Sequence, residues 1–370
     1  MREWRLTFCG GPCVSCATLV GMTDSVIKDV SGRTGRLTLN RPKALNSLDL
    51  GMVRHINEAL AAWRDDDAVE QVVVVSEHPK AFCAGGDVRQ IRDAQIAGNS
   101  AEGDAFFSEE YEMNATIAEF PKPYVAVIDG IAMGGGLGVS LHGSHRVVTE
   151  RASAAMPEMA IGFVPDVGIS WFSQHVDTAS GHPEPSIARF LGLTGYRLNA
   201  ADLLWAGWAT HFVPQDLLEN FLRAVDADGI EAALDEFAED HSEAGESNLA
   251  AFAPCARQIF GFDTWREIEN ALDGGKCSGE ERRVINDLLR SAAPTSLVAG
   301  AELYAANAAE GVDLRTGLRN EYAIGRILRH DPNFAEGVRA VLVDKDRNAQ
   351  WQPKTTGEVD ATPYREAVEK

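Results

Sequence analysis

The 370-residue sequence lacks a long apolar run. A membrane-spanning helix needs about 20 consecutive apolar residues, and no segment approaches that length. We therefore expect no transmembrane helix. Basic residues are also scarce, with 34 Lys and Arg against 55 Asp and Glu and a formal net charge of −21. This balance argues against a nucleic-acid partner, because binding to a phosphate backbone relies on clustered Lys and Arg side chains.

Cysteine is sparse and scattered. The six cysteines show no spacing typical of a small secreted disulfide framework, so we expect a reducing, cytoplasmic location. They are Cys9, Cys13, Cys16, Cys83, Cys255 and Cys277. The first three have a C-x3-C-x2-C spacing similar to the cluster-binding motif of radical SAM enzymes, but they precede any periodic pattern. We expect residues 1–23 to be a disordered extension that holds no metal.

Several common catalytic motifs are missing. The sequence contains no G-x-S-x-G elbow, P-loop or H-E-x-x-H motif. The GGGLG run does not complete a dinucleotide fingerprint, because Val139 or Leu141 occupies the last position that needs glycine. His142 and His145 have no third ligand nearby in the sequence, so we expect structural roles for them rather than a metal site.

Strand and helix patterns alternate in residues 24–194. The β-branched runs Gln71–Ser76 and Tyr124–Ile128 predict buried strands, and apolar residues at helical spacing predict a helix over Leu50–Arg64. Strand–turn–helix units in series predict a largely parallel α/β core. Helical patterns dominate residues 195–352, and the polar residues 353–370 predict a loose tail.

Two glycine-bearing turns, Phe82–Asp87 and Met133–Gly138, each join a predicted strand to a predicted helix. Glycines permit tight turns and leave backbone N–H groups free to face a pocket. Free N–H groups at a helix start favour an anionic oxygen. Two such turns on neighbouring strands can each supply one N–H group to one oxygen, so we expect an oxyanion hole for an acyl carbonyl.

Four segments carry a family resemblance. LNRPKALNSL, AFCAGGD, KPYVAVIDGIAMGGG and AMPEMAIGFVPDVG occur in order between about Thr34 and Val176. Together they resemble the crotonase (enoyl-CoA hydratase/isomerase) superfamily. The resemblance implies a spiral of ββα units followed here by a C-terminal helical section, a coenzyme A thioester as substrate, and no separate cofactor. It also implies a homo-oligomer, a trimer or hexamer.

The same resemblance assigns binding residues. It makes the N–H groups of Gly86 and Gly135 the oxyanion donors. It also implies that the Asn40–Leu48 segment and the end of the strand Phe82–Ala84 line the CoA channel. The residues that we expect to contact CoA from these two segments are Lys43, Leu45, Phe82 and Ala84.

Side chains beyond the second turn indicate the reaction. Hydratases of this fold place one glutamate where this chain has Gly138 and a second where it has Glu158. Adding water to a double bond conveniently uses two carboxylates, so the lack of one argues against hydration. The chain instead has Asp166, and with HGSHRVVTE, LTGYRLNAADLLWAGWATHFV, APTSL and FAEGVRAVLVDKD it resembles the 3-hydroxyisobutyryl-CoA hydrolase branch. In that branch Glu110, within FFSEEYEMN, matches another substrate-contacting position.

Hydrolysis of a short β-hydroxyacyl thioester in valine breakdown is therefore the expected activity. Glu158 is expected to act as a general base or as a nucleophile that forms a mixed anhydride. Asp166 could orient water, bind the substrate's 3-hydroxyl or shift the Glu158 pKa. We expect Cys83 to serve packing. Ile169-Ser170-Trp171-Phe172 replaces the glycine-rich run usual in this branch, so we expect bulkier residues beside the acyl pocket.

Two alternatives remain open from the sequence. An enoyl-CoA hydratase or isomerase would be favoured if Asp166 or Glu110 supplied the carboxylate that Gly138 lacks. A non-catalytic acyl-CoA-binding protein could keep the same fold, although it would have no need of Glu158.

Overall fold

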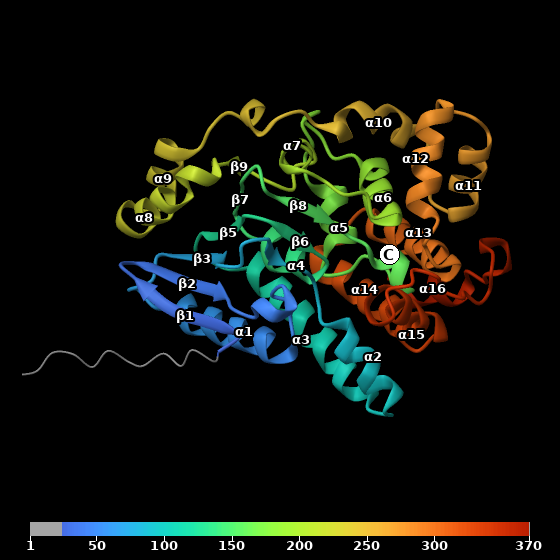
Figure 1. Ribbon diagram of the computed structural model, residues 1–370, viewed down its shortest axis with the longest axis horizontal. Helices are drawn as coiled ribbons and strands as arrows, with labels where there is room; N and C mark the ends of the chain where they lie inside the picture. Colours follow the sequence, from blue (N-terminus) through green and yellow to red (C-terminus); the bar gives the residue numbers. More distant parts are fainter. Residues whose placement is uncertain (1–23, 370) are drawn as a thin grey trace, which may run out of the picture.

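The computed structural model describes residues 24–369 (Figure 1). The expected N-terminal extension and its three cysteines lie outside this range. The strands are β1 Val26–Ser31, β2 Thr34–Leu39, β3 Gln71–Ser76, β4 Ala81–Cys83, β5 Tyr124–Ile128, β6 Ile131–Met133, β7 His145–Val148, β8 Ser153–Ala155 and β9 His211–Phe212. The helices of the first half are α1 Leu50–Arg64, α2 Val88–Ile96, α3 Ser100–Ala118, α4 Gly135–Leu141, α5 Ile169–His175 and α6 Pro185–Thr194.

The second half is almost entirely helical. Its helices are α7 Ala200–Trp205, α8 Leu218–Asp228, α9 Ile230–Phe237, α10 Asn248–Ile259, α11 Trp265–Asp273, α12 Gly279–Leu289, α13 Pro294–Asn307, α14 Leu314–Arg329, α15 Pro332–Val338 and α16 Thr362–Ala367. None of the helices within residues 24–369 is long and apolar enough to cross a membrane. The alternating first half and the helical second half match the expected α/β architecture.

The strands form two sheets. The larger has the order β1-β2-β3-β5-β7-β9, with β1 antiparallel to β2 and the remaining pairs parallel. The smaller has the parallel order β4-β6-β8. Three consecutive strand pairs therefore each send their first strand to the large sheet and their second to the small one. This repeat is the expected ββα spiral, and it places β4 and β6, which lead into the two glycine turns, side by side.

The β-branched run of β3 is explained by burial on both faces. Val72 and Val74 pack in the main core, whereas Val73 and Val75 pack in a second apolar cluster that includes side chains of α8 and α9. A strand covered on both sides needs apolar residues at every position. The strands predicted from this pattern and the helix α1 are confirmed with the expected bounds.

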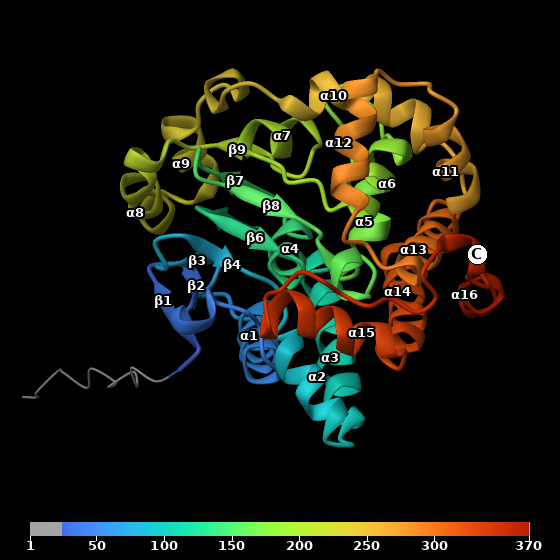
Figure 2. The same cartoon turned by 45° about the vertical axis from the view of Figure 1, so that its right-hand side comes forward.

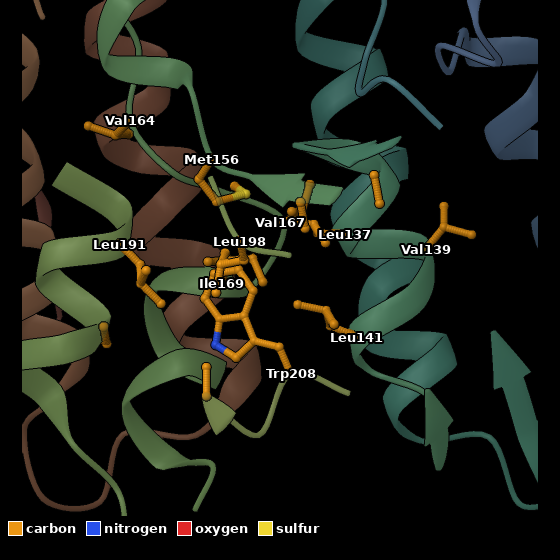
Figure 3. Packing of buried hydrophobic residues seen from close by; sticks show 14 of the residues in the cluster. Leu137, Val139, Leu141, Met156, Val164, Val167, Ile169, Leu191, Leu198 and Trp208 are labelled. Atoms are coloured by element: carbon orange, nitrogen blue, oxygen red, sulfur yellow. The ribbon is translucent and has the colours of Figure 1, made fainter. Parts of the chain in front are cut away.

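One apolar core joins the two halves of the chain. The same cluster of buried side chains runs from Val26 to Tyr364. After the second glycine turn, the Leu137 and Leu141 side chains of α4 point toward Ile169 and Trp208 (Figure 3). Helices α14 and α15 contact α3 and α2, so the C-terminal section covers the helices of the first half (Figures 1 and 2).

The prediction of a loose tail over residues 353–370 is wrong for its described part, residues 353–369. Residues 362–367 form α16, and the Tyr364 side chain is buried in the main core. Asn320 donates to the Glu369 carbonyl at 3.0 Å and accepts from its N–H at 2.7 Å. A polar composition does not reveal these contacts, because one buried aromatic and a few specific hydrogen bonds hold the segment.

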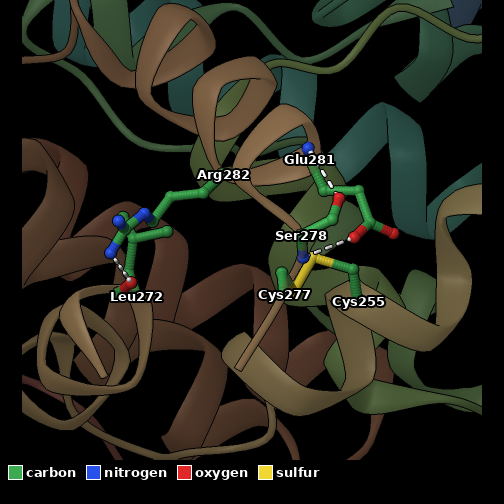
Figure 4. Close-up of a disulfide and its surroundings, with 6 residues drawn as sticks. All are labelled: Cys255, Leu272, Cys277, Ser278, Glu281 and Arg282. Carbon is green, nitrogen blue, oxygen red and sulfur yellow. Dashed lines mark hydrogen bonds between the residues drawn. A yellow bond between two sulfur atoms is a disulfide. The ribbon is translucent and has the colours of Figure 1, made fainter. Parts of the chain in front are cut away.

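The structure also joins two cysteines that the sequence gave no reason to pair. Cys255 on α10 and Cys277, just before α12, form a disulfide (Figure 4). The next residue, Ser278, caps α12 by accepting from the Glu281 N–H, and the Glu281 carboxylate accepts from the Ser278 N–H. The disulfide therefore ties α10 to the start of α12.

Candidate active site

The first glycine turn follows β4 and leads into α2. Gly85 has φ +102, a conformation that favours glycine. Asp87 caps α2 by accepting from the Gln90 N–H at 3.2 Å. Leu48 fixes the turn from the other side, because it donates to the Gly85 carbonyl and accepts from the Asp87 N–H, each at 2.8 Å. The Gly86 N–H between these bonds donates to no other residue of 24–369.

The second turn follows β6 and leads into α4. Gly134 precedes the helix with φ +46 and ψ −119, and Gly135 is the first helical residue. In the described part of the chain the Gly135 N–H, like that of Gly86, donates no hydrogen bond. The two turns touch: a Cβ atom built on Gly135 would lie 3.2 Å from the Gly86 nitrogen. Within residues 24–369 the turns therefore hold two free N–H groups close together.

Two glutamates reach the second turn. Glu158 begins a short 3-10 helix after β8, and its Oε1 lies 2.8 Å from where a Cβ atom on Gly134 would stand. Glu110 on α3 places Oε1 2.5 Å from the corresponding position on Gly135. Glu110 is 2% exposed and Glu158 7% exposed. A side chain at Gly134 or Gly135 would collide with these carboxylates, so glycine at both positions lets the carboxylates reach the turn.

Asp166 lies in a loop held by three other elements. The loop Pro165–Gly168 carries Val167 at φ +54, which is unusual for a β-branched residue. The Tyr111 hydroxyl on α3 donates to Asp166 Oδ2 at 2.7 Å. His142 at the end of α4 contacts the Val167 carbonyl through Nε2 at 2.6 Å. The strained loop is thus fixed from both sides, and Asp166 is only 5% exposed.

Glu321 on α14 is the third support of this loop and was not identified from the sequence. Its carboxylate accepts from the Gly168 N–H at 2.6 Å, the Ser170 N–H at 3.0 Å and the Ser170 hydroxyl at 2.5 Å. It therefore caps α5 directly after the Asp166 loop. Glu321 is fully buried, and burial raises its pKa to about 8. The sequence does not indicate this role for Glu321, because the residue lies 155 positions after Asp166 in an ordinary helical pattern.

Burial raises the pKa of every carboxyl group in the cluster. For Glu110 the charges of Asp166 and Glu158 raise it further, and for Glu158 the charge of Asp166 does so. The pKa of Asp166 rises to about 7 through burial, although the Tyr111 hydrogen bond and the Arg329 charge oppose the rise. A carboxyl group that titrates near neutrality, as Asp166 does, can accept and return a proton in one turnover.

The structure explains the missing carboxylate at Gly138. A Cβ atom there would lie 2.7 Å from the Asn114 Nδ2 atom and 2.7 Å from the Val167 Cβ atom. These two neighbours lie on α3 and in the Asp166 loop, and both are buried. The second glutamate of a hydratase therefore has no room in this chain.

The residues predicted to contact CoA lie in a segment bonded to the first turn. Lys43 and Leu45 are exposed, and the Leu45 carbonyl accepts from the Ala84 N–H at 3.1 Å. Phe82 is fully buried, so its side chain belongs to the core, and its carbonyl accepts from Asn46. The structure thus brings the two predicted segments together but leaves the Phe82 side chain no surface to offer a ligand.

Cys83, His142 and Trp171 have surroundings that indicate structural roles. The Cys83 thiol is buried and its pKa is raised to about 12, so it is a thiol at neutral pH. Burial also lowers the pKa of His142 to about 4. Trp171 donates to the Val312 carbonyl at 2.7 Å and contacts Gly317 on α14. The bulky Trp171 side chain therefore faces the C-terminal section.

Comparison with known proteins identifies the family. Residues 34–368 match the model of the enoyl-CoA hydratase/isomerase family. The chain is 37% identical to 3-hydroxyisobutyryl-CoA hydrolase, mitochondrial, of Xenopus laevis, over 91% of this chain and 88% of that protein. The human protein of the same name is also 37% identical, over 91% of this chain and 86% of its own length.

Solved structures share the fold. A carnitinyl-CoA dehydratase from Mycobacterium thermoresistibile superposes with a TM-score of 0.83 and 37% identity, covering 94% of this chain and 97% of that one. An enoyl-CoA hydratase from Rhodobacter sphaeroides has a TM-score of 0.83 and 34% identity, covering 93% and 97%. These matches confirm the predicted superfamily and the likeness to the hydrolase branch.

The same relatives contradict the expected cytoplasmic location. The frog and human hydrolases are both named as mitochondrial. Cysteine spacing reports on redox chemistry rather than on the organelle, so it gave no sound basis for that expectation.

Proposed function

Because the chain belongs to the enoyl-CoA hydratase/isomerase family, we propose that it hydrolyses a short β-hydroxyacyl-CoA thioester, namely 3-hydroxyisobutyryl-CoA, to 3-hydroxyisobutyrate and CoA. This reaction belongs to valine breakdown. The choice of substrate is supported by the relatives that align over about nine-tenths of the chain, because they are named 3-hydroxyisobutyryl-CoA hydrolases. The observation that carries hydrolysis rather than hydration is the crowding at Gly138, which leaves no space for a second glutamate on α4.

The two glycine turns would act on the thioester carbonyl. The Gly86 and Gly135 N–H groups would bind its oxygen and stabilise the negative charge that develops when the carbonyl carbon is attacked. One donor of this kind is typically worth about 10²–10³ in rate. The exposed segment containing Lys43 and Leu45, bonded to the first turn through Ala84, would hold the CoA moiety.

Glu158 would drive the attack. As a general base it takes a proton from water while the water oxygen adds to the carbonyl carbon. The tetrahedral intermediate then expels CoA thiolate, which takes up a proton. As a nucleophile Glu158 would attack the carbonyl carbon and displace CoA thiolate, which takes up a proton; water would then cleave the resulting mixed anhydride, releasing the acid and restoring the Glu158 carboxylate. The position of its Oε1 against Gly134, beside the Gly135 N–H, fits both routes.

Asp166 would set the protonation state of Glu158. The charge of Asp166 raises the pKa of Glu158, and the charges of Asp166 and Glu158 raise the pKa of Glu110, so the cluster does not carry all of its negative charges at once. A proton held by Asp166 would remove the charge that opposes ionisation of Glu158. A protein that only bound acyl-CoA would gain nothing from burying these carboxyl groups.

A substrate pair tests the proposal. Purified protein is incubated with 3-hydroxyisobutyryl-CoA and, separately, with crotonyl-CoA. We expect release of free thiol from the first and no loss of enoyl absorbance from the second. Loss of enoyl absorbance without thiol release would support the second candidate, an enoyl-CoA hydratase, which the names of the two solved structures favour. The predicted trimer or hexamer stays a prediction, which sedimentation equilibrium can measure.

A further inference from the structure

Asn114 is a buried amide that has no hydrogen-bond partner among residues 24–369. Its side chain is fully buried on α3. Neither Oδ1 nor Nδ2 hydrogen-bonds to any residue in the described part of the chain. Leaving both groups of an amide unpaired in a protein interior is costly. Asn114 therefore differs from buried asparagines of the C-terminal helices, such as Asn307 and Asn320, which both bond to neighbours.

The position of this amide places it in the catalytic cluster. Asn114 is four residues after Glu110 and three after Tyr111, so all three lie on one face of α3. Glu110 from that face reaches Gly135, and Tyr111 binds Asp166. The Asn114 Nδ2 atom lies 2.7 Å from where a Cβ atom on Gly138 would stand, beside Val167. The amide thus lies between α4 and the Asp166 loop.

The chemistry of the amide indicates what it binds. A neutral amide does not remove protons at neutral pH, whereas the surrounding carboxyl groups can. It offers one acceptor and an N–H donor, which match an alcohol that both donates and accepts. Resting on the proposed function, we propose that Asn114 binds the 3-hydroxyl of the β-hydroxyacyl group and so determines specificity for hydroxylated thioesters.

The proposal predicts discrimination against the analogue that lacks the hydroxyl. A site built to hydrogen-bond a substrate hydroxyl rejects the deoxy analogue strongly, because buried polar groups are then left unpaired. Asn114→Leu keeps the number and branching of the side-chain heavy atoms and removes both polar groups. It should lower the ratio of kcat/KM for 3-hydroxyisobutyryl-CoA to that for isobutyryl-CoA by about 10- to 100-fold.

The same variant should also be more stable than the parent protein. It breaks no hydrogen bond within the described residues and removes two unpaired buried groups. We expect its Tm to be unchanged or higher. Asn320→Leu is the matched control: it removes the bonds to Asn307 and Glu369, so it should lower Tm and leave the ratio between the two substrates unchanged.

Binding measurements separate this proposal from the proposed function. The affinities of both CoA esters are measured in Glu158→Gln, in which turnover is expected to be lost, with and without Asn114→Leu or the smaller Asn114→Ala. We expect tighter binding of the hydroxylated ester, and loss of that preference with either change at 114. An equal effect on both esters, or none, would overturn the role of Asn114. Absence of thiol release by the unmodified protein would refute the proposed function instead.

Discussion

At the scale of single residues, the space around Gly138 distinguishes this site from that of a two-glutamate hydratase. Asn114 and Val167 occupy the volume that a side chain at 138 would need. We therefore expect Gly138→Glu to lower Tm by 5 °C or more, since overpacking a buried site typically costs about 1–3 kcal/mol and burying a charge adds to this. Differential scanning calorimetry measures the loss.

The same variant checks the assignment of the reaction. It should not consume crotonyl-CoA, because the new carboxylate cannot take its place without displacing the Asp166 loop. Ser140→Ala on the same helix is a control, since among the described residues 24–369 the Ser140 hydroxyl bonds only to the Gly136 and Leu137 carbonyls of its own helix. Hydration of crotonyl-CoA by Gly138→Glu at unchanged Tm would contradict this account of the site.

Asp166 gives a prediction of pH dependence. Its pKa rises from an ordinary 3.8 to about 7 in the folded protein, chiefly through burial. The folded state therefore binds more protons than the unfolded state between these values, and stability falls as the pH rises from about 4 to about 7. Asp166→Asn removes this effect. Its Tm should exceed that of the parent protein by about 3–5 °C at pH 8.

The difference should shrink as the pH falls toward 4, where Asp166 is protonated in both states. Thermal melts at several pH values measure it. The Tyr111 hydroxyl can still donate to the amide oxygen of the variant, so its hydrogen bond is retained. At each pH the measured quantity is the Tm of Asp166→Asn minus the Tm of the parent protein. A smaller difference at pH 8 than at pH 5 would contradict the sign of this effect.

The predicted site residues differ in how far the sequence revealed them. Gly86, Gly135, Glu158 and Asp166 stand within short motifs whose neighbours in the chain are also their neighbours in space, so the sequence could group them. Asn114 gave no such signal, because an asparagine on a helix is usually solvated. Its importance depends on which atoms surround it, and only the packed structure supplies that information.

At the scale of elements, α14 supports the loop that carries Asp166. Glu321 binds two N–H groups and one hydroxyl at the start of α5. Glu321→Ala leaves these donors unpaired, so we expect kcat to fall by about 10²-fold with a smaller change in KM. Glu321→Gln keeps one acceptor oxygen and should restore part of the rate. Steady-state kinetics on 3-hydroxyisobutyryl-CoA measure both.

Arg326→Ala is the matched control on α14, because Arg326 is exposed in the last turn of the same helix. It should change neither constant. If Glu321→Ala lowered Tm but left kcat unaltered, Glu321 would stabilise the fold without positioning Asp166. The pH profile of kcat adds a second readout, since a shifted Asp166 loop should change the pKa that the profile reports.

Three helices that the sequence analysis did not name individually differ in why they were missed. Helix α10 contains Pro254, which usually ends a helix. Helix α5 follows Gly168 and owes its start to Glu321, far away in the chain. Helix α6 begins with Pro185 after a stretch of turn-forming residues. By contrast, α1 shows a clear apolar stripe and an Asp49 cap, and its bounds were predicted correctly.

At the scale of the whole molecule, the last residues complete the C-terminal helical section. Tyr364 is buried in the main core, and Arg365 pairs with Glu302 on α13 at 2.6 Å. We expect Tyr364→Ala to lower Tm by about 3–6 °C, because removing a buried aromatic side chain typically costs about 3–5 kcal/mol. Glu366→Ala, at an exposed position two residues on, should have no effect. Thermal melts of the two variants test this.

A continuous polar chain connects this segment to the site. Asn320 bonds to Glu369 and to Asn307 at 2.8 Å, Asn307 donates to Ser170 at 2.7 Å, and Ser170 donates to Glu321. Tyr364→Ala should therefore also lower kcat modestly. An unaltered kcat with a lowered Tm would show that the tail stabilises the fold without influence on the loop.

The support of the Asp166 loop by α14 has a consequence for the timing of synthesis. Asp166 leaves the ribosome 155 residues before Glu321 does, since the chain is made from its N-terminus. The alternating first half can begin to fold while the strained turn at Val167 still lacks its carboxylate partner. The chain should therefore acquire activity only near the end of translation, and ribosome-bound intermediates should bind CoA esters before they can cleave them.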